Sequence, residues 1–460
     1  MRKPRRPLAV LIQPPVYDFA LFDLYLKPLG LLRVGRWLEE GGWDVRFVDG
    51  LDYRDSASTA ALGKPKRHAD GTGKFHRQRA VYPQSLPPIG RTYARYGILS
   101  EVLEGRLLEA VGGESPPDAV FVSTGMTYWY PGVEEVCRIV RRIWPGAPLF
   151  TGGVYATLMP EHCKKTTGAD AVVRGDGSTV LRKELKKRGQ PAPEKEVPAV
   201  PLLDAPVWDD AAVLRLNRGC PFRCRYCASG QLCGGFVPGD REAVYSWFEQ
   251  LCRRGVRNFA FYDDALLFRK EEFLRPFLEQ VVEQVEKRHT PGRTIKFYTP
   301  NAVHLRYLDG ETAALMRRAG VQEMRIGFES ADTGFHDLYD GKFEPAEVKD
   351  KLAALSLAGF SSREIRVYIL VGLPGQYAED AQASVRYAEE AGVRITLARY
   401  SPVPGTGLWE ESVRKSRYPI EEEPLFHNNT FFSMEWEGFT RKDLDKLQQR
   451  VVEHNRGLPD

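Results

Sequence analysis

The chain has 460 residues, 43% of them hydrophobic and 27% charged, with a formal net charge of +4. A chain of this length exceeds one ordinary core and predicts two or three domains of ~100 to 200 residues each. The small net charge gives no argument for a nucleic-acid partner. The sequence shows neither an uncharged apolar run of ~18 residues nor a secretory signal, so we expect a cytoplasmic protein without a membrane span.

Short apolar stretches alternate with amphipathic helices over residues 1–181. The clearest helix follows Pro28 and carries its apolar residues on one face. Such alternation predicts an α/β, doubly wound, Rossmann-like domain whose ligand lies outside the carboxyl ends of a parallel sheet. The strand ends are rich in Gly, Ser and Thr, which lets the backbone approach a bulky ligand. We expect strands at residues 8–15, 44–50, 118–124, 147–153 and 168–178.

A basic insertion at about residues 51–95 interrupts this alternation. Within it, residues 61–80 hold six Lys or Arg and two His with few apolar positions. We expect a solvent-exposed loop here, and a lid over an anionic ligand is the alternative. Residues 182–209 contain five prolines and no apolar period, so we interpret them as an extended linker between two αβ regions.

Strands and helices alternate again over residues 210–410. Six apolar strands each end in a polar or Gly/Pro turn. This pattern predicts a partial barrel of six β/α units, a (β/α)6 barrel, with its chemistry at the carboxyl mouth. The short tail at 411–460 is expected to end in a closing helix, with Thr440 and Asp443 in capping-box positions. The apolar face of this helix comprises Leu444, Leu447 and Val451.

Seven cysteines are too few for a disulfide framework in a chain of this size, and three of them lie in the segment CPFRCRYC. Cys220, Cys224 and Cys227 can bind three irons of a 4Fe-4S cluster and leave the fourth iron open. A zinc site would usually require four ligands in matched pairs, and no second CxxC or HxxxH follows. Cys233 is the nearby alternative for a fourth ligand, against a packed or free thiol. The remaining cysteines are expected to be core or surface thiols: Cys137, Cys163 and Cys252.

The spacing CxxxCxxC, with Tyr226 before the last cysteine and a strand before the loop, resembles the radical S-adenosylmethionine (SAM) enzymes. The segments FYDDALLF, TPNAV, IGFES, ILVGLPGQ and YSPVPGTGL look like successive strand ends of that family. The first half is similar to the cobalamin-binding domain that precedes the barrel in its largest subclass. The resemblance covers nearly all of residues 8–410.

Membership would imply a 4Fe-4S cluster whose open iron binds SAM, and an electron donor such as flavodoxin or ferredoxin. Reductive cleavage of SAM would then give methionine and a 5′-deoxyadenosyl radical that abstracts an unactivated hydrogen. In place of the Gly-Gly-Glu of many members, this chain has Asp263 and Asp264 before an alanine. A carboxylate at the mouth could instead pair with a neighbouring arginine. The resemblance assigns the following residues to SAM: Asp263, Asp264, Asn301, Glu329 and Gly372.

Cobalamin proteins that bind cobalt through histidine carry D-x-H-x-x-G after the first strand. The corresponding segment here, PPVYDFALFDLYLKPLG, has no histidine, which fits the cobalamin-dependent radical SAM enzymes that lack this ligand. In the last strand-end motif Ser178 replaces an acid of the usual Gly-Glu-Gly-Glu, so a degenerate domain without cobalamin remains an alternative. The positions matched to the cobalamin tail are Ser123, Thr124, Thr127, Gly152, Gly153, Gly175 and Gly177.

The leading hypothesis is a radical enzyme that uses cobalamin to methylate an unactivated carbon. A rearrangement, cyclisation or bond-forming reaction without net methyl transfer is the second, and a non-catalytic iron-sulfur or cobalamin sensor is the third. The tail beyond residue 416 is short, so we expect a small-molecule, lipid or peptide substrate that enters at the barrel mouth. The cluster loop and the strand-end motifs argue against the sensor. No residue identifies the substrate or a catalytic side chain.

Overall fold

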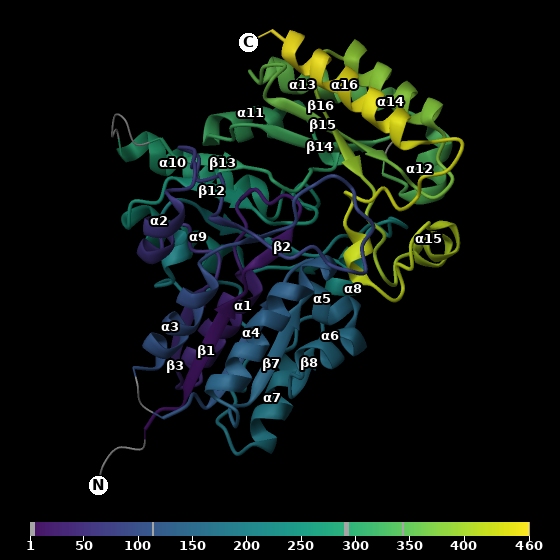
Figure 1. Ribbon diagram of the computed structural model, residues 1–460. Helices are drawn as coiled ribbons and strands as arrows, with labels where there is room; N and C mark the ends of the chain where they lie inside the picture. Colours follow the sequence, from purple (N-terminus) through teal and green to yellow (C-terminus); the bar gives the residue numbers. More distant parts are fainter. Residues whose placement is uncertain (1–4, 113–114, 289–293, 343–344, 460) are drawn as a thin grey trace. The chain divides into compact units, whose positions relative to one another are not determined.

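The computed structural model describes residues 5–112, 115–288, 294–342 and 345–459 (Figure 1). The chain divides into two compact units. The N-terminal unit is Met1–Asp210 with Glu423–Leu425, and the C-terminal unit is Ala211–Glu422 with Phe426–Asp460. Among the described residues, no helix combines the length and the apolar character needed to span a bilayer.

The N-terminal unit contains a parallel five-stranded sheet in the order β3-β1-β6-β7-β8. The order reverses between β1 and β6, and in such sheets ligands bind beside the carboxyl ends at this point. The doubly wound domain predicted from the sequence is therefore confirmed. The strands are β1 (Leu8–Gln13), β3 (Asp44–Asp49), β6 (Ala119–Thr124), β7 (Leu149–Gly153) and β8 (Ala171–Val173).

Helices pack apolar stripes against this sheet. In α4 (Tyr130–Ile143), Val133, Val136 and Val140 are buried in one core cluster with residues of β1 and β6. Their spacing of three and four residues is that of a single helical face. The other helices of this core are α1 (Leu29–Glu40) and α3 (Ser100–Val111).

The basic insertion is more ordered than a solvent-exposed loop. It contains α2 (Ser56–Leu62), and its strands β4 (Arg77–Arg79) and β5 (Ala94–Tyr96) form an antiparallel sheet with β2 (Val16–Asp18). Phe75 and His76 are almost completely buried. A few buried residues hold this segment in place. They stand singly among many charged residues, so the average composition of the segment does not reveal them.

The linker predicted at 182–209 began too early. Helix α7 (Ser178–Lys187) covers its first six residues and buries Leu181 and Leu185. Two side chains of α1 hold the segment after this helix, because Trp37 Nε1 donates to the Lys195 carbonyl at 2.7 Å and Arg33 Nε to the Pro198 carbonyl at 2.6 Å. The proline-rich stretch is thus extended but packed.

The C-terminal unit contains the six predicted strands, arranged as two parallel sheets in the orders β13-β12-β9 and β14-β15-β16. Isolated parallel bridges, Phe297 with Val321 and Val303 with Ile326, occur between the two sheets. The strands are β9 (Ala212–Leu214), β12 (Asn258–Phe261), β13 (Lys296–Tyr298), β14 (Met324–Glu329), β15 (Ile365–Val371) and β16 (Arg394–Arg399). The partial barrel is therefore confirmed.

Helices cover one face of each sheet. Over the first sheet lie α9 (Arg241–Arg253) and α10 (Leu274–Arg288), where Phe248 of α9 packs on Phe259 with ring centroids 4.8 Å apart. Along β14, β15 and β16 run α13 (Pro345–Leu357), α14 (Ala378–Glu390) and α16 (Arg441–Gly457) (Figure 1). Helix α11 (Gly310–Ala319) precedes β14.

The closing helix predicted at the C-terminus is α16, and its capping box is present. The Thr440 side chain accepts a hydrogen bond from the Asp443 backbone N–H, and the Asp443 side chain accepts one from the Thr440 backbone N–H. The predicted apolar face of the helix is buried. Asn455 on this helix accepts from the Ile395 N–H and donates to the Ile395 carbonyl, both at 2.8 Å. Helix α16 therefore bonds directly to the backbone of edge strand β16.

Candidate functional site

The cysteine loop begins with a tight backbone crossing. Strand β10 (Asn217–Arg218) pairs antiparallel with β11 (Val237–Pro238), which follows the short helix α8 (Ser229–Cys233). Gly219, with φ of +74°, lies so close to this returning segment that an added Cβ would stand 1.9 Å from the Gly235 carbonyl oxygen. Only glycine satisfies both the left-handed conformation and this approach.

Two aspartates that follow β12 hold the start of the loop. Asp263 is 3% exposed and accepts from the backbone N–H of Asn217 at 2.7 Å and of Leu216 at 3.0 Å. Asp264 accepts from the Gly219 N–H at 3.0 Å. Burial raises the pKa of Asp263 to about 7, and the two backbone hydrogen bonds oppose that shift. The two acids expected at SAM thus position the loop that carries the cysteines.

The three cysteines share this loop but differ in exposure. Cys220 is buried, Cys224 is half-buried and Cys227 is exposed, and the Cys227 N–H donates to the Cys224 carbonyl at 3.1 Å. Burial raises the pKa of Cys220 to about 11 and that of Cys224 to about 12, and the other thiols of the loop contribute to both shifts. Cys233 is half-buried at the end of α8. The cysteines expected to be core or surface thiols, Cys137, Cys163 and Cys252, are all buried.

This donor set fits a cubane cluster better than one metal ion. In the described part of the chain, no group of three His, Cys, Asp or Glu side chains stands close enough to hold a single ion. A cubane places each thiolate on a different iron, so its ligands lie farther apart than those of one ion. A cluster with one open iron requires three soft thiolate ligands. The CxxxCxxC spacing supplies these three and no fourth.

A second group of side chains ties the loop to the end of α12 (Thr333–Tyr339). The Tyr226 hydroxyl donates to Asp340 at 2.7 Å, and the other Asp340 oxygen lies 2.9 Å from His336 Nδ1. His336 Nε2 lies 2.9 Å from the Ser330 carbonyl. The Arg225 N–H donates to the Tyr339 carbonyl at 2.8 Å. Side chain and backbone together fix the segment between the second and third cysteines.

Lys342 is the functional residue that sequence reasoning missed. It is 6% exposed, its Nζ donates to Glu329 at 3.0 Å, and it lies 5.3 Å from the centre of the Tyr226 ring. Burial raises the pKa of Cys220 and of Cys224, and the Lys342 charge opposes the shift of both thiols. Glu329, expected at SAM, thus has a partner inside the protein, and this partner is a lysine and not the arginine that the alternative named.

The two remaining positions assigned to SAM also contact the protein. The Asn301 amide donates to the carbonyls of Tyr262 and Asp263 at 3.2 and 3.4 Å. Gly372, with φ of +83°, follows β15, and an added Cβ there would stand 2.7 Å from the ring of Phe432. The sequence contained no signal for this close approach of the tail. The assignment of both residues to SAM stays a prediction.

In the N-terminal unit, the residues matched to cobalamin gather at the carboxyl edge of the sheet. Ser123 and Thr124 end β6 and stand opposite Gly152 and Gly153 of β7. Gly153, with φ of +122°, allows the two strands to approach, since an added Cβ would lie 2.3 Å from the Thr124 carbonyl. Beside them, Thr127 begins a 3-10 turn, and Gly175 and Gly177 lie between β8 and α7.

A buried atom without a partner lies at the same edge. Gln13 ends β1, and among the described residues none donates a hydrogen bond to its buried Oε1. A buried acceptor of this kind is costly unless a ligand supplies the donor. The amide side chains of a corrin ring are such donors. The glycine-rich strand ends and this acceptor therefore fit a cobalamin, and Gln13 is a further residue that could hold it.

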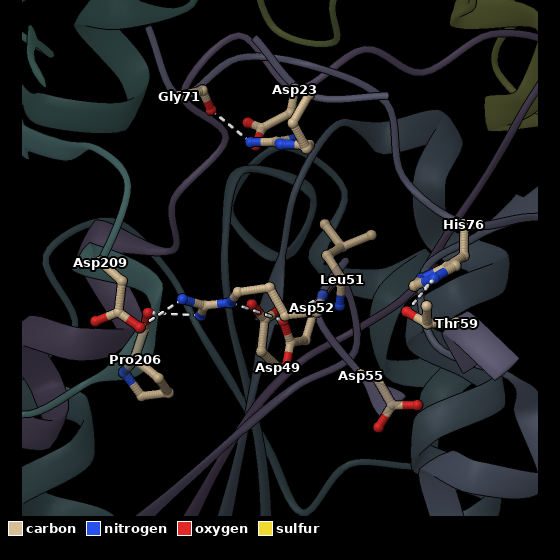
Figure 2. A network of polar contacts seen from close by, with 12 residues as sticks. Asp23, Asp49, Leu51, Asp52, Asp55, Thr59, Gly71, His76, Pro206 and Asp209 are labelled. Carbon is tan, nitrogen blue, oxygen red and sulfur yellow. Dashed lines mark hydrogen bonds and ion pairs between the residues drawn. The ribbon is translucent and has the colours of Figure 1, made fainter. Parts of the chain in front are cut away.

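Charged residues crowd the neighbouring strand end (Figure 2). Asp49 ends β3 in register with Gln13, and its Oδ1 accepts from the Leu51 N–H at 2.9 Å. Arg67 pairs with Asp23 at 2.8 Å, and its guanidinium lies 3.8 Å from the centre of the Tyr53 ring. Arg54 joins Asp52 to the Pro206 carbonyl and Asp209. Burial raises the pKa of Asp49 to about 6 and lowers the pKa of Lys27.

We expect Asp49→Asn to stabilise the protein at pH 8. The folded state binds a proton at Asp49 more tightly than the unfolded state does, so the wild type loses stability as pH rises from about 4 through 6. The variant lacks this loss and should be more stable at pH 8 by on the order of 1–2 kcal/mol, with the difference fading near pH 4. Thermal unfolding at both pH values measures it, with Asp44→Asn at the other end of β3 as the control. A lower midpoint for Asp49→Asn at pH 8 would contradict the prediction.

Comparison with known proteins bears on both units. The family model "Radical SAM superfamily" matches residues 214–388, and the model "B12 binding domain" matches residues 101–183. The chain carries a radical SAM domain preceded by a B12-binding domain. The cofactors that these two domains bind are a 4Fe-4S cluster with SAM, and cobalamin. The three loop cysteines lie inside the radical SAM match.

The relatives that the chain matches are distant in sequence. An uncharacterized methyltransferase of Pyrococcus horikoshii is 22% identical over 71% of this chain and 73% of its own. The anaerobic magnesium-protoporphyrin IX monomethyl ester cyclase of Cereibacter sphaeroides is 23% identical over 65% of this chain and 53% of its own. In fold, the chain resembles the radical SAM methyltransferase TsrM of Kitasatospora setae, with a TM-score of 0.67 and 14% identity, over 99% of this chain and 89% of that one.

Proposed function

We propose that this protein methylates an unactivated carbon of a small-molecule, lipid or peptide substrate, with SAM and cobalamin as cofactors and flavodoxin or ferredoxin as electron donor. The single observation that carries this proposal is the three-cysteine loop, anchored at the carboxyl mouth of a barrel, in one chain with a B12-binding domain. The methyltransferase relative and the fold of TsrM support it.

The residues of the loop have separate tasks in this scheme. Cys220, Cys224 and Cys227 hold the cluster and leave one iron open for SAM. When bound, the cluster supplies the electron for SAM cleavage and the cobalamin supplies the methyl group. Asp263 and Asp264 hold the first turn of the loop by accepting its backbone N–H groups.

Lys342 and its partners act on the charge at the mouth. Its cation lies beside the loop on the side of Tyr226, and Glu329 and Asp340 hold it in place through its Nζ and its backbone N–H. A fixed positive charge in a water-poor site stabilises the thiolate form that iron binding requires. We assign Lys342 a positioning and electrostatic role, not one in proton transfer.

One relative favours a second candidate function. The Cereibacter sphaeroides protein is named a cyclase, so a ring-forming reaction without net methyl transfer is the second candidate. Both reactions consume SAM and begin with hydrogen abstraction. They differ in the fate of the methyl group.

Methyl-deuterated SAM separates the two functions. With methylation we expect a labelled product that accumulates in step with 5′-deoxyadenosine, methionine and S-adenosylhomocysteine, because one SAM is cleaved and a second provides the methyl group. Mass spectrometry of the product and chromatography of the three nucleoside and amino-acid products measure this. Protein reconstituted without cobalamin is the control and should give no labelled product. An unlabelled product formed with 5′-deoxyadenosine but without S-adenosylhomocysteine would exclude methylation and favour the cyclase-like reaction.

A further inference from the structure

Three arginines form one row across the second sheet of the barrel, which we call the arginine row. Arg325 of β14 stands opposite Arg366 of β15, and Arg366 stands opposite Arg394 of β16. Residues directly opposite each other share a face of the sheet. On β15 the alternate residues Ile365 and Val367 are at most 1% exposed and form the helix-covered face. The arginine row therefore lies on the inner face of the barrel.

The charge of this row is not balanced. Glu323 accepts from Arg325 Nε at 2.6 Å and lies 3.8 Å from Arg366. Arg366 Nε is buried without a hydrogen-bond partner, and Arg394 makes no ion pair within the described residues. Three guanidinium groups thus share one carboxylate. Like charges directly opposite each other in a sheet are destabilising, and a poorly hydrated charge needs a counter-ion.

Two guanidinium groups of the row, those of Arg325 and Arg366, each donate a hydrogen bond toward the carboxyl mouth. Arg325 Nη1 donates to the Tyr368 hydroxyl at 3.2 Å, and Arg366 Nη1 donates to Thr396 Oγ1 at 3.2 Å. Tyr368 and Thr396 stand opposite each other, two positions nearer the carboxyl ends than the arginine row. Side chains of Arg325 and Arg366 keep 11% and 19% of their surface exposed, so a small ion can reach them. Burial lowers the pKa of Arg366, and the neighbouring arginine charges lower it further.

We propose that the arginine row binds an oxyanion of the substrate, either a carboxylate, a phosphate or a phosphonate. The planar fork of each guanidinium matches two oxygens of such a group. Leu370 lies four residues beyond Arg366 on the same face, about 13 Å at ~3.3 Å per residue. An anion held by the row therefore directs the rest of a small molecule toward the mouth. This inference rests on the proposed function, because it assigns the anion to the methylated substrate.

Titration of the reconstituted holoprotein with inorganic phosphate, methylphosphonate and acetate tests the site. We expect wild type to bind at least one of these probes, and Arg366→Gln and Arg394→Gln to weaken binding about tenfold or more, since each removes a charge-assisted hydrogen bond. The control is Arg386→Gln, an exposed arginine of α14, which should bind as wild type does. The preferred probe shows which oxyanion the row selects. Equal affinity in all four proteins would overturn the proposal.

Thermal unfolding shows whether a variant loses anion binding only because its fold is destabilised. Without added anion, Arg394→Gln should unfold no earlier than wild type, because it relieves repulsion within the row. Added phosphate should raise the midpoint of wild type but not of Arg366→Gln. An earlier midpoint of Arg394→Gln in anion-free buffer would contradict the charge argument.

The assay for methyl transfer separates this inference from the proposed function. If Arg366→Gln forms labelled product with the same KM for the substrate as wild type, the arginine row does not bind the substrate, whereas the proposed methyl transfer stands. Anion binding that is lost in Arg366→Gln, in a protein that forms only unlabelled product, would refute methylation while the anion site stands.

Discussion

Cys224→Ala should abolish SAM cleavage. Cys224 is the middle ligand of the loop. The chain is held on both sides of it, because the Gly219 N–H donates to Asp264 and the Tyr226 hydroxyl donates to Asp340. Without its thiolate, one iron of the cubane loses its only protein ligand, and two cysteines cannot hold the cluster at the mouth. Anaerobically reconstituted wild type should be brown and contain about four irons per chain. The variant should be nearly colourless, lose most of this iron and form no 5′-deoxyadenosine.

Cys233→Ala is the matched control for this experiment. Cys233 lies in the same segment, at the end of α8, and is half-buried like Cys224. It lies outside the CxxxCxxC spacing, so its loss should leave the iron content and SAM cleavage close to those of wild type. Full SAM cleavage by Cys224→Ala would refute the ligand assignment. Loss of iron in Cys233→Ala would identify Cys233 as a fourth ligand.

Lys342→Met should make the cluster harder to reduce. Reduction adds negative charge beside a buried cation, and removing that cation destabilises the reduced state more than the oxidised one. We expect about tenfold less reduced cluster at a fixed potential, a shift of about 59 mV for one electron. Redox titration followed by electron paramagnetic resonance measures this shift without any substrate.

Two conservative variants distinguish charge from packing at this position. Lys342→Arg keeps the cation and should retain most of the wild-type potential. Glu329→Gln removes the carboxylate that pairs with Lys342 at 3.0 Å and should make the cluster easier to reduce. A wild-type potential in Lys342→Met would show that the lysine serves only the local fold.

Local sequence patterns were enough to predict the repeated strands but not the packed irregular segments. Each barrel strand is an apolar run followed by a polar or Gly/Pro turn, and this signal is local. The sheet β2-β5-β4 and the helix α7 were missed for another reason. Their stability comes from single buried residues such as Phe75 and Leu185, which sit among charges and prolines and leave no periodic pattern.

The candidate site shows the same division between local and long-range information. The cysteine spacing is contained in eight residues, so the sequence alone points to a cluster. Lys342 depends on a chain reversal after α12 that brings its cation back to Tyr226, and no motif surrounds it. The arginine row depends on register between three strands, which the sequence does not state. The prediction that Asp263 and Asp264 contact SAM could not anticipate that both would also bind the loop backbone.

The bonds from Asn455 to both backbone groups of Ile395 have a consequence for the open side of the barrel. A complete barrel closes its last strand against its first, whereas six strands leave β16 with unpaired peptide groups. An exposed strand of this kind is a template for pairing with another polypeptide. The amide of Asn455 takes the place of a neighbouring strand at one residue, and α16 packs against β16. We therefore expect the last helix to limit self-association, and proteolysis ahead of Thr440 to leave an aggregation-prone fragment.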